Sequence, residues 1–252
     1  MKKSAFTLAE VLITLGIIGV VAALTIPTLI QRHQEQKTVS QLLKVYSTLS
    51  QAFLLMQSEY GPIDTWGLTN TATNKKDPET NKHIYDLSSQ KIIAERLKTY
   101  LKVSKTCELN KVCLNRPEYN ISGDKISDKI MQTSASDSPP EASFFLDDGT
   151  FIQLGYYNIS ESIQKDISVI LPGNDKIVLG KNRFFFNYNK KGVFPEGTMN
   201  GYTLTSFDNC DPDNKGSRIM RGCTAWVIYN RNLDYLHCRS KLGWDKQQSC
   251  KK

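Results

Sequence analysis

The residues of this chain that could carry redox, metal-binding or nucleophilic chemistry are its cysteines and histidines. The three histidines, His33, His83 and His237, lie far apart in the sequence. His237 is adjacent to Cys238, but neighbouring side chains on a strand point to opposite faces, so the two would not form a catalytic pair there. We therefore expect structural roles for all three histidines.

The six cysteines favour disulfides over a metal site. An even number is typical of a domain that folds in an oxidising compartment. Five residues separate the first two, and twelve, fourteen and eleven separate the last four, so no C-x-x-C zinc pair occurs. We expect the first two to close a short loop and the last four to cross-link the C-terminal region. The disulfide candidates are Cys107, Cys113, Cys210, Cys223, Cys238 and Cys250.

Two acidic clusters could bind a cation or act as an acid–base pair. Asp147-Asp148-Gly149 is most simply a tight hairpin turn, because Asp-Gly tolerates the positive φ angles that such turns need. The stretch Asp208–Gly216 is rich in oxygen ligands, but it contains Lys215 and no Glu closes an EF-hand loop. The sequence also has no G-x-S-x-G, H-E-x-x-H or phosphate-loop motif. We expect no metal, no cofactor and no catalytic residues, and thus no enzyme.

The N-terminus contains the most informative stretch. Lys2 and Lys3 precede an apolar run, Val11–Ile30, that has no charged residue. Twenty helical residues at about 1.5 Å each span about 30 Å, the thickness of a bilayer's hydrocarbon core. Glu10 precedes that run, where a carboxylate is costly unless a positive group meets it. The pattern predicts a transmembrane helix with a partner in the membrane.

These residues carry a family resemblance. The stretch from Lys2 to Leu12 resembles the processing site of type IV prepilins and type II secretion pseudopilins. The similarity continues through Ile13–Ala23 to Pro27, so that basic residues, acid, apolar run and proline all coincide. It covers about thirty residues at the N-terminus.

The resemblance implies a processing step and an assembly step. A separate prepilin peptidase would remove residues 1–5 by cutting between Ala5 and Phe6, and the new amine of Phe6 would be methylated. The family usually has Gly where this chain has Ala5. Pro27 aligns with a proline that bends the family's long helix. The amine of Phe6 is the nearest cation that processing creates, so we expect it to meet Glu10 of a neighbouring copy during assembly.

Two other interpretations of the N-terminus remain open. A basic start followed by Val21-Ala22-Ala23 also fits a secretory signal peptide, and an uncleaved membrane anchor would contain the same apolar run. Three features count against a signal peptide: the acid at Glu10, an apolar run longer than the roughly 7–15 residues expected, and helical periodicity that continues past the run.

Beyond residue 30 the sequence stays helical and becomes amphipathic. Gly61-Pro62 would end the helix, because Gly releases the backbone and Pro does not continue it. We expect one helix from about Phe6 to Tyr60, with a transmembrane half at 6–30 and an amphipathic half at 31–60. The apolar positions at three- and four-residue steps are Val39, Leu42, Leu43, Tyr46, Leu49, Phe53 and Met56.

Residues 61–252 are expected to form one head of α+β class. We predict a surface loop at Thr69–Lys82, a helix at Ser89–Val103 and an exposed connection at Ser134–Ala142. A helix followed by short antiparallel strands predicts a small sheet packed on the amphipathic helix, as the pilin resemblance also implies. The expected strands are Ser143–Leu146, Thr150–Leu154, Ile167–Leu171, Lys176–Leu179, Arg183–Tyr188 and Thr224–Tyr229.

The net charge of +7 is partly concentrated at the C-terminal end, where residues 239–252 contain five basic residues and one acid. Such a stretch could contact DNA phosphates or an acidic neighbour. It shows no pattern of stacking aromatics, and a run of charge is usually a solvated surface. We expect no nucleic acid partner.

The sequence thus predicts a structural subunit of a type IV pilus or a type II secretion pseudopilus. Its partners would be copies of itself, related pilins and a prepilin peptidase. It would cross the inner membrane once, with the head in the periplasm or in an extracellular filament. A membrane-anchored binding domain that never polymerises and a DNA-uptake pilin are the alternatives.

Overall fold

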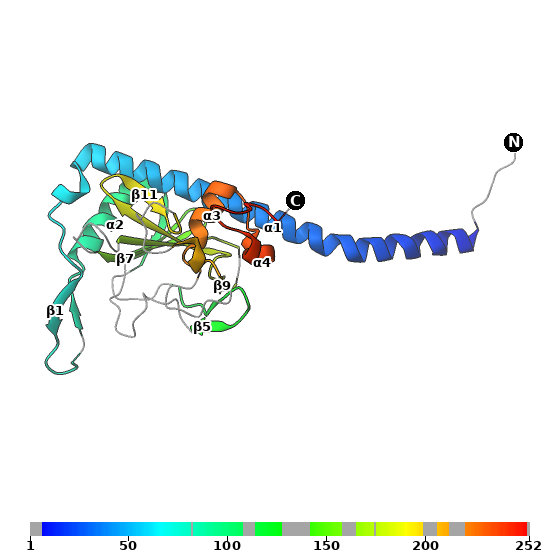
Figure 1. The fold of residues 1–252 in the computed structure, drawn as a ribbon. Helices are drawn as coiled ribbons and strands as arrows, with labels where there is room; N and C mark the ends of the chain where they lie inside the picture. Colours follow the sequence, from blue (N-terminus) through cyan, green and yellow to red (C-terminus); the bar gives the residue numbers. More distant parts are fainter. Residues whose placement is uncertain are drawn as a thin grey trace.

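A computed structural model describes residues 7–81, 83–107, 114–127, 142–157, 165–173, 175–198, 206–211 and 220–250. Its longest element is helix α1, Leu8–Tyr60, which is 53 residues long. The head lies along one side of the second half of α1, and the first half extends away from it (Figure 1). The predicted helix, from about Phe6 to Tyr60, therefore agrees with the structure from Leu8 onward; Thr7 is its extended N-cap, and Phe6 lies outside the described residues.

The head is built on a six-stranded antiparallel sheet in the order β11-β10-β8-β7-β6-β3. A small sheet, β5-β4-β9, and a hairpin, β1-β2, accompany it. Within the small sheet, strands β4 and β9 run parallel to each other. The strands are β1 (Ala72–Lys76), β2 (His83–Tyr85), β3 (Val103–Thr106), β4 (Glu118–Tyr119), β5 (Lys125–Ser127), β6 (Ala142–Leu146), β7 (Phe151–Tyr157), β8 (Lys165–Ile170), β9 (Ile177–Val178), β10 (Arg183–Asn189) and β11 (Gly192–Pro195).

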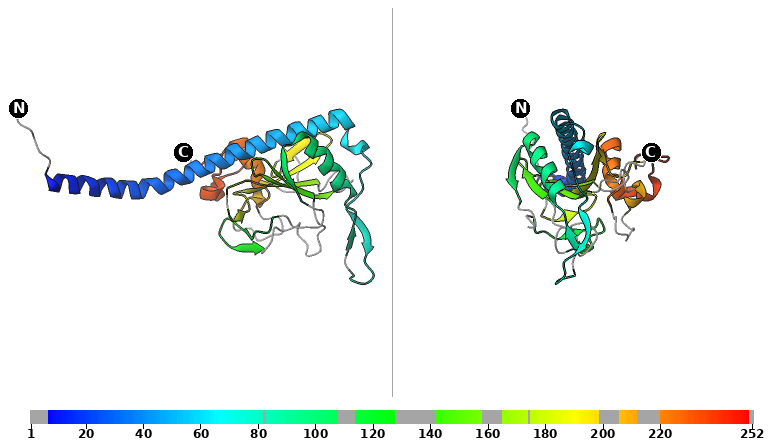
Figure 2. Two further views of the ribbon diagram at one scale, coloured as in Figure 1. Left: turned by 180° about the vertical axis from the view of Figure 1, so that it is seen from behind. Right: turned by 90° about the vertical axis from the view of Figure 1, so that its left-hand side faces the viewer.

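Shorter helices flank the long one. Viewed along α1, α2 lies on one side of it and α3 on the other, with the sheet beneath (Figure 2). The outer side of α1 is left uncovered by any of these elements (Figure 2). The shorter helices are η1 (Ile63–Thr65), α2 (Ser88–Tyr100), η2 (Phe207–Asn209), α3 (Cys223–Asn230), α4 (Tyr235–Cys238) and η3 (Arg239–Lys241).

The core lies between α1 and one face of the sheet. Along β10, Phe184, Phe186 and Tyr188 alternate with polar or aromatic neighbours and are buried in one cluster with the α1 stripe. Tyr46 stacks on Phe186 with ring centroids 5.8 Å apart, and Phe53 packs on Tyr188 at 5.0 Å. Each such side chain contributes on the order of 1.5–3 kcal/mol when it is fully buried. A long helix packed on an antiparallel sheet confirms the predicted α+β class.

Two predicted elements are wrong. The segment Thr69–Lys82 was expected to be a loop, but β1 and β2 form a hairpin across it. The Asp77 carboxylate accepts the backbone N–H groups of Glu79 and Thr80 and so fixes the turn. Because backbone hydrogen bonds and polar side chains hold this hairpin, it lacks the apolar alternation by which strands are recognised.

The second error is Thr224–Tyr229, which was expected to be a strand and lies in helix α3. Its β-branched and aromatic residues favour a strand locally, but Thr224, Trp226 and Ile228 are all buried along with the residues between them. Arg231 ends the helix in the left-handed conformation at φ 54°. Tertiary packing on several sides therefore overrides the local preference.

Other boundaries shift by a few residues. Helix α2 ends at Tyr100 rather than at Val103, because Leu101 is extended and Val103 opens β3. Ala142 is buried as the first residue of β6, and the rest of the expected connection from Ser134 lies outside the described residues. The hairpin turn at Asp147-Asp148-Gly149 is present, with Gly149 at φ 82°.

Candidate assembly site

The N-terminal end of α1 is fixed by Thr7 and Glu10. The Glu10 carboxylate accepts the backbone N–H and the hydroxyl of Thr7, both at 2.8 Å, and the Glu10 N–H donates to the Thr7 hydroxyl at 3.3 Å. This reciprocal capping box starts the helix just after the expected cut, although Ala5 and Phe6 themselves lie outside the described residues. The Thr-x-x-Glu spacing signals such a box in the sequence.

Within the part of the chain that the structure describes, the apolar half of α1, from Val11 to Ile30, is left exposed. A window of 18 residues within α1 is apolar enough to cross a membrane, and none of that window is buried. Gly16 and Gly19 have open space where a Cβ would be. Pro27 lies inside α1, and the bend expected there stays a prediction. The core helix of a soluble protein would be mostly buried, and this half of α1 differs from one in that respect.

The head-side half of α1 buries the predicted stripe. Val39, Leu42, Leu49, Phe53 and Met56 are buried, together with Val45 and Ala52 between them. Leu43 and Tyr46 are partly buried against the same core. This half therefore holds the head by ordinary core packing.

A polar contact joins the outer side of this half to the head. The ammonium of Lys44 lies 2.9 Å from the carboxylate of Asp148 in the β6–β7 turn. Burial acts to raise the pKa of Asp148, but hydrogen bonds from Lys44 and Thr150 outweigh it and lower that pKa. Lys44 thus forms an exposed ion pair with its own head.

An arginine packs on aromatic rings at the C-terminal end of α1. The guanidinium of Arg96 on α2 lies 4.4 Å from the ring centre of Tyr60 and 4.3 Å from that of Trp66. Tyr100 donates a hydrogen bond to Glu59, which raises the pKa of Tyr100 to about 12. These contacts fix the head at the point where the helix ends.

The described residues 206–211 and 220–250 form a disulfide-linked C-terminal unit beside α1. Cys210 is bonded to Cys223, and Cys238 to Cys250. Cys107 is disulfide-bonded as well, whereas Cys113 lies outside the described residues, so the pairing of these two stays a prediction.

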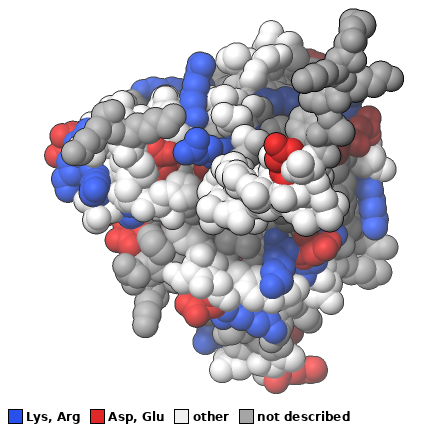
Figure 3. All heavy atoms as spheres, turned by 90° about the vertical axis from the view of Figure 1, so that its right-hand side faces the viewer, with Lys and Arg blue, Asp and Glu red and all other residues white. Residues whose placement is uncertain are grey.

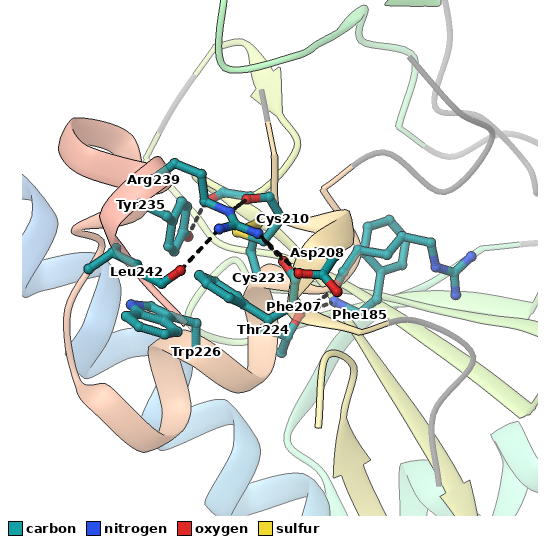
Figure 4. Close-up of a disulfide and its surroundings, with 12 residues drawn as sticks. Phe185, Phe207, Asp208, Cys210, Cys223, Thr224, Trp226, Tyr235, Arg239 and Leu242 are labelled. Carbon is teal, nitrogen blue, oxygen red and sulfur yellow. Dashed lines mark hydrogen bonds and ion pairs between the residues drawn. A yellow bond between two sulfur atoms is a disulfide. The ribbon is translucent and has the colours of Figure 1, made fainter. Parts of the chain in front are cut away.

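Arg239 ties this unit together around an aromatic stack (Figure 4). Its guanidinium donates to the backbone carbonyl of Cys210 at 2.5 Å and to that of Phe207 at 3.0 Å. It also lies 4.1 Å from the ring centre of Phe207, whose other face stacks on Trp226 at 4.1 Å. Arg239, which was expected to belong to a solvated basic tail, therefore has a structural role.

His237 links the same unit to α1. Its Nε2 lies 2.9 Å from the carboxylate of Glu35. His33 is exposed on α1, and the side chain of His83 is outside what the structure describes. The contact with Glu35 is the structural role that we expected for His237.

Two clusters of buried charge, which the sequence did not reveal, lie on the sheet face away from α1. Arg221 lies 2.7 Å from Asp166 and 2.6 Å from Glu196. Burial acts to lower the pKa of Arg221, but the two carboxylates outweigh it and raise that pKa. Arg183 on β10 pairs with Glu118 on β4 and donates to Ser168 at 2.8 Å. The one feature of the sequence that indicates these clusters is Arg183, the first residue of the apolar strand β10.

Within the described ranges, no three His, Cys, Asp or Glu residues are grouped so as to hold a metal. The second half of the oxygen-rich stretch, residues 212–216, lies outside those ranges. On the end of the head from which the apolar half leaves, basic and acidic side chains are interspersed among the residues coloured in Figure 3. Among the described residues, the most prominent feature is the exposed apolar half of α1.

Comparison with known proteins places the chain in a family. The model of a family of unknown function (DUF6613) matches residues 28–212, which is more than half of the chain. The chain belongs to this family. A model of the prokaryotic N-terminal methylation motif matches residues 1–26 of this DUF6613 chain, and that motif is the type IV pilin and pseudopilin signal. No curated protein and no solved structure matches the chain.

The two matches divide the DUF6613 chain near the end of its apolar half. The methylation motif covers the basic start, Glu10 and most of the apolar run, and the DUF6613 match begins at Thr28 and runs through most of the head. The chain is therefore a pilin-like or pseudopilin-type protein. One apolar helix and the motif are consistent with a single-pass membrane protein.

Proposed function

We propose that this chain is a structural subunit of a type IV pilus or a type II secretion pseudopilus. The observation that carries the proposal is the methylation motif at residues 1–26, on an apolar helix that no described residue buries. A motif of this kind is typical of proteins that assemble through that helix. The chain would be a building block rather than an enzyme.

The first step would be processing at the inner membrane. A separate prepilin peptidase would cut between Ala5 and Phe6 and leave a methylated amine on Phe6. Residues 6–30 would span the membrane, residues 31–60 would hold the head, and residues 61–252 would form the head on the far side. The disulfides of the C-terminal unit fit an oxidising compartment there.

The second step would be docking against copies of this chain and related pilins. Burying a lone carboxylate in the apolar region costs on the order of 2–3 kcal/mol unless a cation meets it. The capping bonds to Thr7 hold the Glu10 carboxylate at the first turn of the helix. The amine of Phe6 on a neighbouring copy, shifted along the filament axis, would neutralise Glu10 and fix the register between the two copies.

Replacing Glu10 tests this mechanism. Glu10→Gln keeps the shape and loses the charge, so the variant should insert in the membrane but form few filaments, and Glu10→Ala should fail similarly. Glu79→Gln in the exposed turn of the β1–β2 hairpin is the matched control and should assemble normally. Shearing followed by sedimentation separates filaments from membrane-bound protein. Normal filament yield from Glu10→Gln would refute the charge-pair mechanism.

A further inference from the structure

Helix α4 lies at the end of the head nearest the apolar half of α1 (Figure 1). His237 on α4 contacts α1 there, because its Nε2 lies 2.9 Å from the carboxylate of Glu35. The hydroxyl of Tyr235, also on α4, donates to the backbone carbonyl of Gly180 in the turn between β9 and β10. This end of the head is therefore formed by α4, the β9–β10 turn and the first turns of α1 beyond the apolar half.

This end lies at the depth of the lipid headgroups when the apolar half spans a bilayer. Glu35 is five residues beyond Ile30, the last residue of the apolar run, which places it about 7.5 Å further along the helix axis. A bilayer measures about 40–45 Å with its headgroups and about 30 Å without them, so the headgroup layer of one leaflet is about 5–7 Å thick. The contact between His237 and Glu35 therefore lies where the headgroups meet water.

Exposed basic side chains gather at this level. Arg32 and Lys37 stand on α1 on either side of Glu35. Lys181 lies in the β9–β10 turn, and Lys241 ends η3, which follows α4 directly. Within the part of the chain that the structure describes, none of these four basic residues forms an ion pair. Their charges are therefore available to an anion outside the chain.

Acidic side chains also lie on this end of the head (Figure 3). The acids of the C-terminal unit and of the α1 segment beside it are Glu35, Asp208, Asp211, Asp234 and Asp245. The first four each have a partner within the chain. Asp245 is exposed next to the exposed Lys246, and in the β8–β9 loop Asp175 is exposed next to the exposed Lys176. These acids therefore leave the four basic side chains with a net positive charge.

We propose that this end of the head rests on anionic lipid headgroups of the membrane in which α1 is inserted. A lipid surface is the partner that the position itself supplies, since the bilayer lies at this level wherever the apolar half is inserted. Guanidinium and ammonium groups donate charge-assisted hydrogen bonds to lipid phosphates, and Arg32, Lys37, Lys181 and Lys241 supply such groups. The contact would fix the tilt of α1 before the chain meets another copy. The inference rests on the membrane insertion that the proposed function includes, and it does not depend on filament assembly.

Depth-dependent fluorescence quenching tests this contact. The full chain is reconstituted in vesicles of phosphatidylcholine, with or without phosphatidylglycerol, that contain a lipid spin-labelled on its headgroup. A fluorescent amino acid at position 240, exposed in η3, should be quenched strongly only when phosphatidylglycerol is present. The same amino acid at position 31, directly after the apolar run, should be quenched in both kinds of vesicle. At position 58, exposed near the far end of α1, it should be quenched in neither.

The outcomes separate the inference from the proposed function. If position 31 is quenched while position 240 is not, or is quenched equally in both kinds of vesicle, the contact with anionic lipid is wrong and membrane insertion stands. If position 31 is not quenched, the apolar half is not inserted, and the membrane step of the proposed function fails together with the inference.

Charge reversal provides a second measurement. In vesicles with phosphatidylglycerol, Lys37→Glu with Lys241→Glu should lower the ratio of docked to undocked head, measured by quenching at position 240, by roughly tenfold or more. Lys75→Glu with Lys91→Glu changes the charge equally on β1 and α2, at the other end of the head (Figure 1), and should leave that quenching unchanged. Undiminished quenching in the Lys37 and Lys241 double variant would overturn the inference.

Discussion

His237 Nε2 lies 2.9 Å from the carboxylate of Glu35, although 202 positions separate the two residues. Glu35 stands on α1 just after the apolar half, and its side chain is only 18% exposed. The disulfide between Cys238 and Cys250 begins at the residue after His237. The C-terminal unit therefore holds α1 at the near end of the head, as the stack of Arg96 on Tyr60 does at the far end.

Removing the imidazole should weaken this near contact. We expect His237→Ala to lower the free energy of unfolding by up to about 1 kcal/mol, because the pair is partly exposed and solvent weakens it. Denaturant unfolding of the full chain in detergent, followed by tryptophan fluorescence, measures the loss. His33→Ala, an exposed histidine on the same helix, should leave stability unchanged. Equal losses from both variants would show that the Glu35 contact contributes nothing.

The C-terminal disulfide should contribute more. Cys238 and Cys250 are 12 positions apart, and closing a loop of that length restricts the unfolded chain. We expect the double variant Cys238→Ser with Cys250→Ser to lose on the order of 2–4 kcal/mol in denaturant unfolding. In exported wild-type chain, thiol labelling under denaturing conditions should find no free cysteine. Labelled thiols there would contradict the proposed oxidising location of the head.

The features that could be predicted from the sequence are those set by local pattern. The apolar run and the stripe from Val39 to Met56 fix the long helix, because each repeats at helical steps over many turns. Asp147-Asp148-Gly149 fixes a hairpin, because its turn geometry depends on the residues themselves. The N-terminal motif also depends on adjacent residues, so it was recognisable without a structure.

The rest depends on contacts between distant residues. Helix α3 forms in a strand-like sequence because it is packed against the rest of the head, where the Thr224 hydroxyl accepts the backbone N–H of Phe185 on strand β10. The pairing of Arg221 with Asp166 and Glu196 joins residues far apart in the sequence, which no local pattern reveals. The exposure of Leu54 and Leu55 likewise appears only once the head is placed on α1.

The buried charge cluster makes a strong prediction for stability. Arg221→Met would leave the carboxylates of Asp166 and Glu196 buried without their shared cation, which costs on the order of 3–5 kcal/mol. Lys98→Met is the matched control, because Lys98 pairs with Glu95 on the surface of α2 and such pairs contribute about 0–1 kcal/mol. Denaturant unfolding distinguishes the two. A loss below about 1 kcal/mol for Arg221→Met would show that the cluster is not a structural element.

Tyr235 should make the head sensitive to alkaline pH. It is buried, and its hydroxyl donates to the backbone carbonyl of Gly180. Burial, and after it the charge of Glu35, raise the pKa of Tyr235 well above the ordinary value of 10.0. The unfolded chain can ionise this tyrosine near its ordinary pKa, while the folded chain cannot. The stabilisation is therefore fully present below about pH 10 and is lost as the pH rises above it, at about 1.4 kcal/mol per pH unit.

Tyr235→Phe isolates that contribution. At neutral pH the variant should lose about 1 kcal/mol with the hydrogen bond, but its stability should then fall less steeply than that of the wild type above pH 10. Urea unfolding of the full chain in detergent at several pH values around and above 10 measures both slopes. Tyr229→Phe, at a tyrosine that is 56% exposed, should leave the slope of the wild type unchanged. If the curves of wild type and Tyr235→Phe run parallel above pH 10, Tyr235 ionises in the folded head and is not held neutral by burial.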